Sequence, residues 1–422
     1  MNTVGIISEY NPFHKGHLYH LQKAKEITGS RTLIVIMNGN FVQRGEPALL
    51  DKWTRSKIAL ANGADLVIEL PLIYGIRSAE YFASGAIQIL DKSNIIDSIV
   101  FGSETGRIEP LKEIARILLQ EKENLEEILQ EELARGKAFP VARETALKDY
   151  LLANPDRFSF SPGELLEILN EPNNILAIEY LKSLEDLKSV IHPFTIKRLG
   201  SGYHEKELKN TIASATAIRE LVYQGKLEKA KAYLPENTYQ IMSKAIEEGI
   251  APADLDNFSL MLISSIRKLN IEKLREYAEI NNGLEHRIYR EVHRAGKFKE
   301  LVQNIKTRAY TWTRIQRNLL HLFFNLKEED FNYLDQFGPQ YIRILGVSKE
   351  RLDLLGRLKN KANLPVIVNP AEYLREIDPE SKDPLIKSLS YDILASDIYS
   401  LLYKNPAYRQ GHQDFTRPLI KY

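Results

Sequence analysis

The short segment His14-Lys15-Gly16-His17 constrains the fold of this chain more than any other feature of its sequence. It follows an apolar run at residues 4–8 and precedes a helical pattern at residues 18–27, so it lies at a predicted strand-to-helix turn. The free N–H groups and the positive dipole end of such a helix favour a bound phosphate. Gly16 has no side chain and lets a nucleotide approach the backbone closely. The turn therefore predicts a phosphate-binding site on an α/β fold.

Four more short runs rich in β-branched residues follow, at residues 33–37, 66–70, 99–101 and 194–198, with helical patterns between them. Continuous apolar strands separated by helices are typical of a parallel sheet that is covered on both faces. Right-handed crossovers between such strands produce a doubly wound sheet. We therefore predict the α/β fold class, with a doubly wound, Rossmann-like parallel sheet and ligands at the carboxyl ends of its strands.

The pattern changes twice along the chain. Charged amphipathic helices replace it over about residues 107–152, which predicts a helical insertion. After about residue 224 the strand signals nearly disappear, apart from one isolated strand at residues 366–368. We therefore predict one domain over residues 1–224, which contains the insertion, and a mostly α-helical C-terminal domain over residues 225–422.

The composition excludes several classes of function. There are no cysteines, which excludes disulfides, thiol catalysis and cysteine-based zinc sites. The 57 basic and 56 acidic residues leave a net charge of +1, so any nucleic-acid binding must come from local basic patches. No apolar run approaches the roughly 18 residues of a membrane span, and the first residues lack the pattern of a signal peptide. We therefore expect a cytoplasmic protein without membrane contact.

His14 and His17 are the candidate catalytic residues. Because they are three positions apart, they lie on one side of the first helical turn, where both imidazoles can donate hydrogen bonds to a triphosphate and to charge developing at its α-phosphorus. Two such histidines can also be ordinary surface residues or a metal pair. The preceding strand and the intervening glycine favour the phosphate role, and no third metal ligand is evident nearby. We therefore predict no metal ligand from the protein itself.

A second candidate phosphate site follows the fifth predicted strand. Ser214 is suited to cap a helix that runs through residue 221, and Thr216 and Arg219 lie in its first turns. Hydroxyl groups and an arginine at a helix start bind phosphate, although capping alone would also explain Ser214. We predict that the three side chains hold the β- and γ-phosphates opposite the histidine turn.

The two motifs together resemble those of the nucleotidyltransferase superfamily that has an H-x-G-H motif. A closer resemblance is to the bacterial tRNA(Met) cytidine acetate ligase family, and it is carried by the stretches EYNPFHKGHLYHL, MNGNFVQRGEPALLDKWTRSKIALANGADLVIELP, VFGSE and EPNNILAIEYL. It implies a ligase that joins acetate to ATP, giving acetyl-adenylate and pyrophosphate. The acetyl group then passes to N4 of the wobble cytidine of elongator tRNA(Met). The implied cofactors are ATP and Mg²⁺, the latter carried by ATP.

The resemblance also implies the nucleotide contacts. Gly102, at the end of the fourth strand, would touch the nucleotide, and Arg198 would help to complete the pocket. One residue of the pair Asn173 and Asn174 would join them, with Asn174 preferred. The implied ATP-binding turn comprises Ile7, Ser8, Glu9, Tyr10, Asn11, Pro12, Phe13, His14, Lys15, Gly16, His17, Leu18, Tyr19 and His20.

The acetate would lie beside the α-phosphate. The turn with Asn38, Asn40 and Phe41 stands at the carboxyl end of the second predicted strand, which is the expected place for the acid. We predict that Asn38 or Asn40 hydrogen-bonds the carboxylate and that Phe41 closes the pocket around the methyl group. Arg44 and Arg55 are candidates for binding the acid or tRNA phosphates. A purely structural role is an even alternative for each of these residues.

The helical half contains the candidate RNA surface. Residues 301–327 include basic and aromatic residues but no acidic one. Basic side chains mixed with aromatic ones suit RNA phosphates and unstacked bases, whereas a solvated helix face is the common alternative. The predicted tRNA-binding residues are Arg308, Trp312, Arg314 and Arg317. We predict no protein partner.

Two other functions fit parts of the sequence. A small-molecule adenylyltransferase would share the active-site chemistry but would not need the helical residues 225–422. A non-catalytic RNA-binding protein would not need the histidine turn. The fold class alone does not separate these alternatives.

Overall fold

The protein is described from a computed structural model that covers residues 2–135, 139–169, 171–198, 213–308 and 310–422. Its centre is a sheet of five parallel strands in the order β5-β2-β1-β6-β7. These strands are β1 (Thr3–Ser8), β2 (Thr32–Asn38), β5 (Leu66–Leu70), β6 (Ser98–Ser103) and β7 (His192–Lys197). Each corresponds to one of the five apolar runs of the sequence, and the predicted fold class is confirmed.

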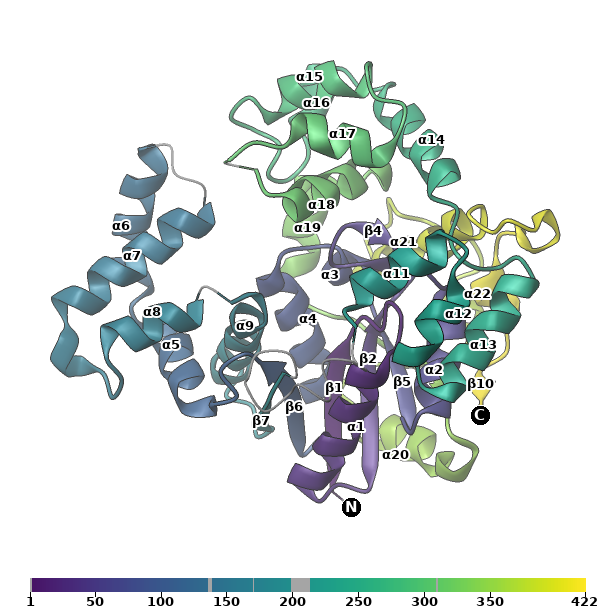
Figure 1. Ribbon diagram of the computed structural model, residues 1–422, viewed down its shortest axis with the longest axis horizontal. Coiled ribbons are helices and arrows are strands. Elements are labelled where there is room, and N and C mark those ends of the chain that lie inside the picture. Colours follow the sequence, from purple (N-terminus) through teal and green to yellow (C-terminus); the bar gives the residue numbers. More distant parts are fainter. Residues whose placement is uncertain (1, 136–138, 170, 199–212, 309) are drawn as a thin grey trace.

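Successive residues of the strands point to opposite faces of this sheet, and helices cover both faces (Figure 1). Leu33 and Val35 of β2 pack in the cluster that contains α1 (Lys15–Thr28), whereas Ile34 and Ile36 pack in the cluster of α4 and α9. On that second face are α3 (Leu72–Gly75), α4 (Ala79–Lys92) and α9 (Pro172–Asp186), and α2 (Lys52–Ala61) lies on the face of α1. The strand order reverses between β1 and β6, so their carboxyl ends frame the place where doubly wound sheets bind ligands.

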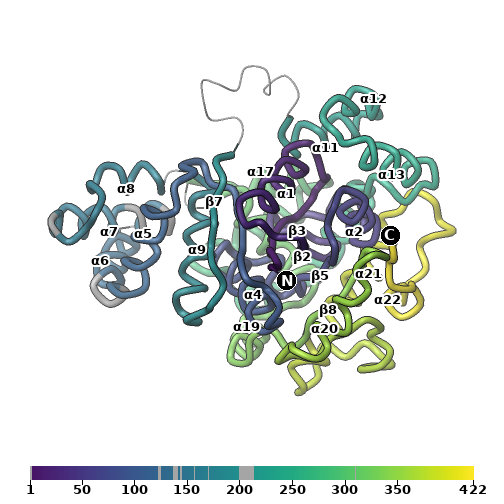
Figure 2. The backbone as a smooth tube through the Cα atoms, turned by 90° about the horizontal axis from the view of Figure 1, so that it is seen from below, coloured from purple at the N-terminus to yellow at the C-terminus, as the bar shows by residue number. Residues whose placement is uncertain are grey.

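The second half of the chain completes this sheet, which the sequence analysis did not anticipate. Strand β8 (Ile342–Val347) pairs antiparallel to β5, and β9 (Val366–Ile367) and β10 (Ile420–Lys421) pair parallel to β8. The strand predicted to be isolated at residues 366–368 is therefore a sheet strand, and that detail of the prediction was wrong. Figure 2 shows the C-terminal end of the chain beside α2, which contacts β10.

A helical arm lies at the side of the sheet (Figure 1); it begins where the insertion was predicted and extends past its predicted end at about residue 152. It consists of α5 (Ile108–Gln120), α6 (Lys122–Ala134), α7 (Phe139–Ala153) and α8 (Pro162–Leu169). Helix α5 packs against α9, and its residues Leu111 and Ile114 join the main core, which fixes the base of the arm. Helices α6 and α7 pack mainly against each other.

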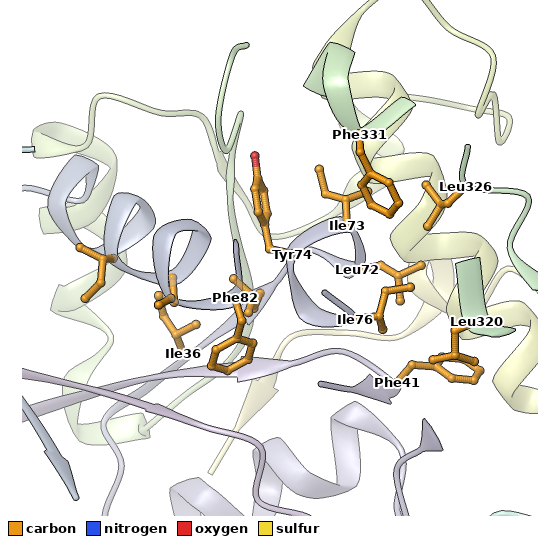
Figure 3. Close-up of a cluster of buried hydrophobic side chains, with 14 of the residues drawn as sticks. Ile36, Phe41, Leu72, Ile73, Tyr74, Ile76, Phe82, Leu320, Leu326 and Phe331 are labelled. Carbon is orange, nitrogen blue, oxygen red and sulfur yellow. The ribbon is translucent and has the colours of Figure 1, made fainter. Parts of the chain in front are cut away.

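The described chain after β7 is otherwise mostly helical. Its helices include α11 (Ala215–Tyr223), α12 (Leu227–Ala230), α13 (Glu236–Glu247), α14 (Leu255–Ile266), α15 (Ile271–Leu274), α16 (Leu284–Val292), α17 (Phe298–Ile305), α18 (Trp312–Phe323), α19 (Glu328–Asp335), α20 (Asp353–Lys361), α21 (Pro384–Ser400) and α22 (Gln413–Thr416). One hydrophobic cluster joins the two halves: Figure 3 shows Phe41 and Ile76 beside Leu320 of α18. Within the described residues, no helix combines the length and the apolar character needed to cross a bilayer.

Candidate active site

The histidine turn places two imidazoles at the start of α1, beyond the end of β1. His14 is the N-cap residue, and its Nδ1 accepts a hydrogen bond from the Gly16 N–H at 3.0 Å. The His14 N–H donates in turn to Nδ1 of His17 at 3.3 Å. A neutral imidazole that accepts at Nδ1 must carry its proton on Nε2. Both histidines therefore offer an Nε2–H donor, as the phosphate role requires.

The surroundings of these rings keep both neutral. The rings stack with centroids 3.9 Å apart, and Tyr10 and Phe13, both almost fully buried, pack against His17. Burial and, secondarily, the charge of Arg198 lower the pKa of His14 to about 4. Burial also lowers the pKa of His17 well below its ordinary value. Near pH 7 the pair consists of uncharged hydrogen-bond donors.

Other residues of the turn have local structural partners. His20 contacts the Val100 carbonyl oxygen through Nε2 at 3.1 Å, and burial lowers its pKa to about 4. Asn11 accepts the Leu49 N–H through Oδ1 at 2.7 Å. The Lys15 ammonium donates to the Ala232 carbonyl oxygen at 2.6 Å. These contacts hold the turn in place.

The second sequence motif lies against the first one. Ser214 caps α11 by accepting the Ala217 N–H at 3.2 Å. One nitrogen of Arg219 donates to the Asn11 carbonyl oxygen at 2.8 Å, and the other donates to the Thr216 hydroxyl at 3.3 Å. The hydrogen bond from Arg219 to Asn11 therefore joins the start of α11 to the turn before α1, the two places that were predicted to bind phosphate.

Gly102 and Arg198 lie side by side at the carboxyl ends of β6 and β7. A Cβ added at Gly102 would be 3.0 Å from Cγ of Arg198, so a side chain there would crowd the arginine. Arg198 is exposed at the end of β7, and its charge contributes to lowering the pKa values of His14 and His17. The structure thus brings this predicted residue close to the histidine pair.

Asn174 holds the turn after β6. Its Oδ1 accepts the Glu104 N–H at 2.9 Å and the Thr105 N–H at 3.3 Å, and its Nδ2 donates to the Ile168 carbonyl oxygen at 3.0 Å. Asn173 is more exposed and donates through Nδ2 to the Glu104 carboxylate. The geometry gives Asn174 a clear positioning role, and a direct contact of either asparagine with the nucleotide stays a prediction.

The predicted acetate residues Asn38, Asn40 and Phe41 are buried at the carboxyl end of β2. Asn38 Nδ2 donates to the Gly75 carbonyl oxygen at 2.8 Å, which leaves its Oδ1 without a hydrogen-bond partner among the described residues. Asn40 Oδ1 accepts the Lys52 N–H at 2.7 Å, and its Nδ2 is the atom without a described partner. The ring of Phe41 packs on Phe324 in the core, so its side chain serves packing at least in part.

Arg55 has a structural role. It is 1% exposed, and its guanidinium donates to the carbonyl oxygens of Leu50, Glu9 and Gly39. A side chain committed to three backbone carbonyl groups and closed to solvent cannot reach a tRNA phosphate. Instead it ties the loop after β1 to the loop after β2.

A buried ionic cluster beneath the Asn38–Asn40 turn was missed by the sequence analysis. Lys52 Nζ lies 2.8 Å from Glu69 Oε1 and 2.9 Å from Asp414 Oδ1, and Arg343 lies 3.3 Å from the same Asp414 oxygen. A Cβ at Gly39 would be 2.6 Å from Glu69 Oε1. The signal was Glu69 itself, because a charged residue inside the apolar run LVIEL needs a buried partner.

The hairpin formed by β3 (Phe41–Val42) and β4 (Glu46–Pro47) stands over the histidine turn. The Gln43 N–H at its tip donates to Glu9 Oε1 at 2.8 Å. Glu46 pairs with Arg219 at 3.2 Å. Burial raises the pKa of Glu9, and the charge of Arg44 opposes this shift. The hairpin is therefore joined to both helix starts of the site.

The predicted tRNA-binding residues lie on α18 and the loop before it. Arg308 is exposed, and Trp312 and Arg317 are half-buried. Arg314 pairs with Glu279 at 3.0 Å, so its charge is partly compensated within the protein. Their contact with RNA stays a prediction.

A doubly wound sheet with neutral histidines at the first helix start defines a nucleotide-binding protein of the nucleotidyl-transfer class. In agreement, residues 1–414 match the model of the HIGH nucleotidyl transferase family.

Proteins of similar sequence and structure identify a particular family within this class. The chain is 48% identical over 421 residues to the tRNA(Met) cytidine acetate ligase of Halothermothrix orenii and 41% identical over 425 residues to that of Acetivibrio thermocellus, covering all of each chain. The structure of Thermotoga maritima TmcAL bound with α-thio ATP superposes with a TM-score of 0.92 at 34% identity, again over the whole of both chains. The chain belongs to the tRNA(Met) cytidine acetate ligase family.

Proposed function

We propose that the protein is an ATP-dependent ligase that forms N4-acetylcytidine at the wobble position of elongator tRNA(Met), with acetyl-adenylate as intermediate. The observation that supports this most is the neutral histidine pair at the start of α1, joined to the second helix start through Arg219 and Asn11. The relatives named above are called tRNA(Met) cytidine acetate ligases, and the match extends along their full length. A substrate of this kind makes the cytoplasm the compartment that we expect.

In the first step, an acetate oxygen attacks the α-phosphorus of ATP. The new O–P bond forms as the bond to the pyrophosphate oxygen breaks, and pyrophosphate leaves with that electron pair. The Nε2–H groups of His14 and His17 and the N–H groups at the start of α1 would stabilise the negative charge that develops. Arg219 and Thr216 would bind the β- and γ-phosphates.

Asn40 is the better candidate of the two asparagines for binding acetate. Its buried Nδ2 is a donor without a partner among the described residues, whereas the unpartnered atom of Asn38 is an acceptor. A carboxylate accepts hydrogen bonds and so would satisfy Asn40 but not Asn38 Oδ1.

Magnesium would arrive with the triphosphate and neutralise part of its charge. Within the part of the chain that the structure describes, no group of three or more His, Asp or Glu side chains is placed to hold a metal ion.

In the second step, N4 of the cytidine attacks the acetyl carbonyl carbon. A C–N bond forms, the bond to the phosphate oxygen breaks, AMP leaves with the electron pair, and N4 loses one proton. The small-molecule adenylyltransferase reading is disfavoured, because the full-length match includes the helical half.

The test is incubation of the purified protein with ATP, magnesium, labelled acetate and elongator tRNA(Met) transcript, followed by nucleoside analysis. We expect labelled N4-acetylcytidine, and we expect His14→Ala and His17→Ala to lose it by roughly 100-fold or more. The control is His286→Ala, since this side chain is 59% exposed and lies on α16. If acetyl-adenylate forms but no label appears on the RNA, tRNA is not the acetyl acceptor. If neither acetyl-adenylate nor labelled RNA forms, the proposed function is refuted.

A further inference from the structure

Arg44 is an exposed cation at the tip of the β3–β4 hairpin. Within the described residues the structure gives it no hydrogen bond or ion pair. Two other arginines of the site and of α18 do form ion pairs: Arg219 faces Glu46 at 3.2 Å, and Arg314 faces Glu279 at 3.0 Å. The Glu9 carboxyl is the acidic group whose pKa responds to the charge of Arg44, but no ion pair between the two is formed, so the guanidinium donors of Arg44 can bind a phosphate in a bidentate manner.

The hairpin that carries Arg44 touches the helical half directly. Gly45 has a φ of +83°, and a Cβ there would lie 2.5 Å from the backbone nitrogen of Arg317 and 2.6 Å from the backbone carbon of Gln316. The tip of the hairpin therefore rests on the backbone of α18. This is the helix that carries most of the predicted tRNA-binding residues.

The other side of the hairpin is fixed to the nucleotide site. Gln43 donates to Glu9 at 2.8 Å, and Glu46 pairs with the arginine of α11. Arg44 thus lies between the surface of α18 and the place of the first reaction step.

We propose that Arg44 binds a phosphodiester of the tRNA next to the acetylated cytidine, and so guides the RNA backbone from α18 into the active site. This inference rests on the proposed function. In the proposed function, the RNA that lies on α18 extends toward the histidine turn. The hairpin tip lies on this path, because it contacts the backbone of α18 through Gly45 and the turn through the hydrogen bond from Gln43 to Glu9. Arg44 could in principle bind a phosphate of ATP instead of a phosphate of the RNA. In the proposed function, however, the ATP phosphates are bound by the two helix starts and Arg219.

The experiment compares wild type, Arg44→Ala, Arg44→Lys and a control, Arg31→Ala. Arg31 is also exposed and stands just before β2, at the opposite end of the sheet. Three quantities are measured: affinity for elongator tRNA(Met) between about 50 and about 200 mM salt, acetate-dependent exchange of pyrophosphate into ATP, and acetyl transfer to the tRNA.

We expect Arg44→Ala to weaken tRNA binding by roughly tenfold at low salt and to reduce the slope of log affinity against log salt by about 0.7–1. The KM for ATP in the exchange reaction should stay near the wild-type value. Arg44→Lys should recover much of the affinity, since it restores the charge, and Arg31→Ala should behave as wild type.

Two results would overturn the inference while leaving the proposed function intact. One is an Arg44→Ala variant that acetylates tRNA with wild-type affinity and salt slope. The other is a variant whose KM for ATP rises while tRNA affinity is unchanged, which would assign Arg44 to the triphosphate. Failure of the wild type itself to bind or acetylate the tRNA would instead count against the proposed function.

Discussion

His20 is a half-buried histidine whose imidazole makes the stability of this fold sensitive to acid. Its pKa is about 4 in the folded chain because of burial, against an ordinary value of 6.5. Between these values the unfolded chain binds more protons than the folded one, so stability falls as the pH falls from about 6.5 to about 4. His14 and His17 act in the same direction.

We predict that His20→Gln, whose amide can still donate to Val100, loses less stability between pH 7 and pH 5 than the wild type. Urea unfolding at the two pH values measures this. The same change at the exposed His286 is the matched control. An unaltered pH dependence in His20→Gln would show that this ring does not titrate with folding.

Lys52 is the residue on which the buried ionic cluster depends. Lys52→Met leaves the carboxylates of Glu69 and Asp414 buried with Arg343 as their remaining cation. Breaking such a buried pair destabilises by roughly 3–5 kcal/mol. We expect this loss in the free energy of urea unfolding.

The control for Lys52 is Lys23→Met. Lys23 pairs with Glu26 at 2.7 Å on the surface, where such pairs contribute about 1 kcal/mol or less. Equal losses in the two variants would mean that the cluster contributes no more than a surface pair.

At the level of elements, the β3–β4 hairpin connects the strand half of the molecule to helix α18. Gly45→Ala adds a Cβ against the backbone of α18 and also strains a positive φ. Gly29→Ala strains a φ of +62° in open space, at a cost of about 1 kcal/mol. We predict a larger loss for Gly45→Ala in urea unfolding and, unlike Gly29→Ala, a loss of acetyl transfer to tRNA.

The strands and the buried ion pair differ in how far they could be predicted from the sequence alone. The five parallel strands were predictable because each contains a short run of β-branched and apolar residues. Strand β8 has a similar run, IRILGV, but it stands alone among helical patterns and no neighbouring strand marks its partner. The histidine turn was predictable for the opposite reason, since its chemistry is local. The ion pair of Lys52 with Asp414 spans 362 positions, and no local pattern indicates it.

On the scale of the whole molecule, the sheet depends on both ends of the chain. Residues 1–224 contain neither β8 nor Asp414, so β5 would have an open edge and Lys52 would lose a partner. We predict that this fragment alone gives no cooperative unfolding transition, whereas the full chain does. Thermal unfolding followed by circular dichroism tests this. A sharp transition of the fragment would support residues 1–224 as an independent domain.

The place of β8 and β10 has a consequence for biosynthesis. A chain emerging from the ribosome presents β5 as an unpaired edge until residues 342–347 have been made, and the sheet is completed only when residues 420–421 are released. Open strand edges favour pairing with other chains. The nascent protein therefore passes most of its synthesis with an exposed edge, and a chaperone that shields β5 during translation would raise the yield of folded enzyme.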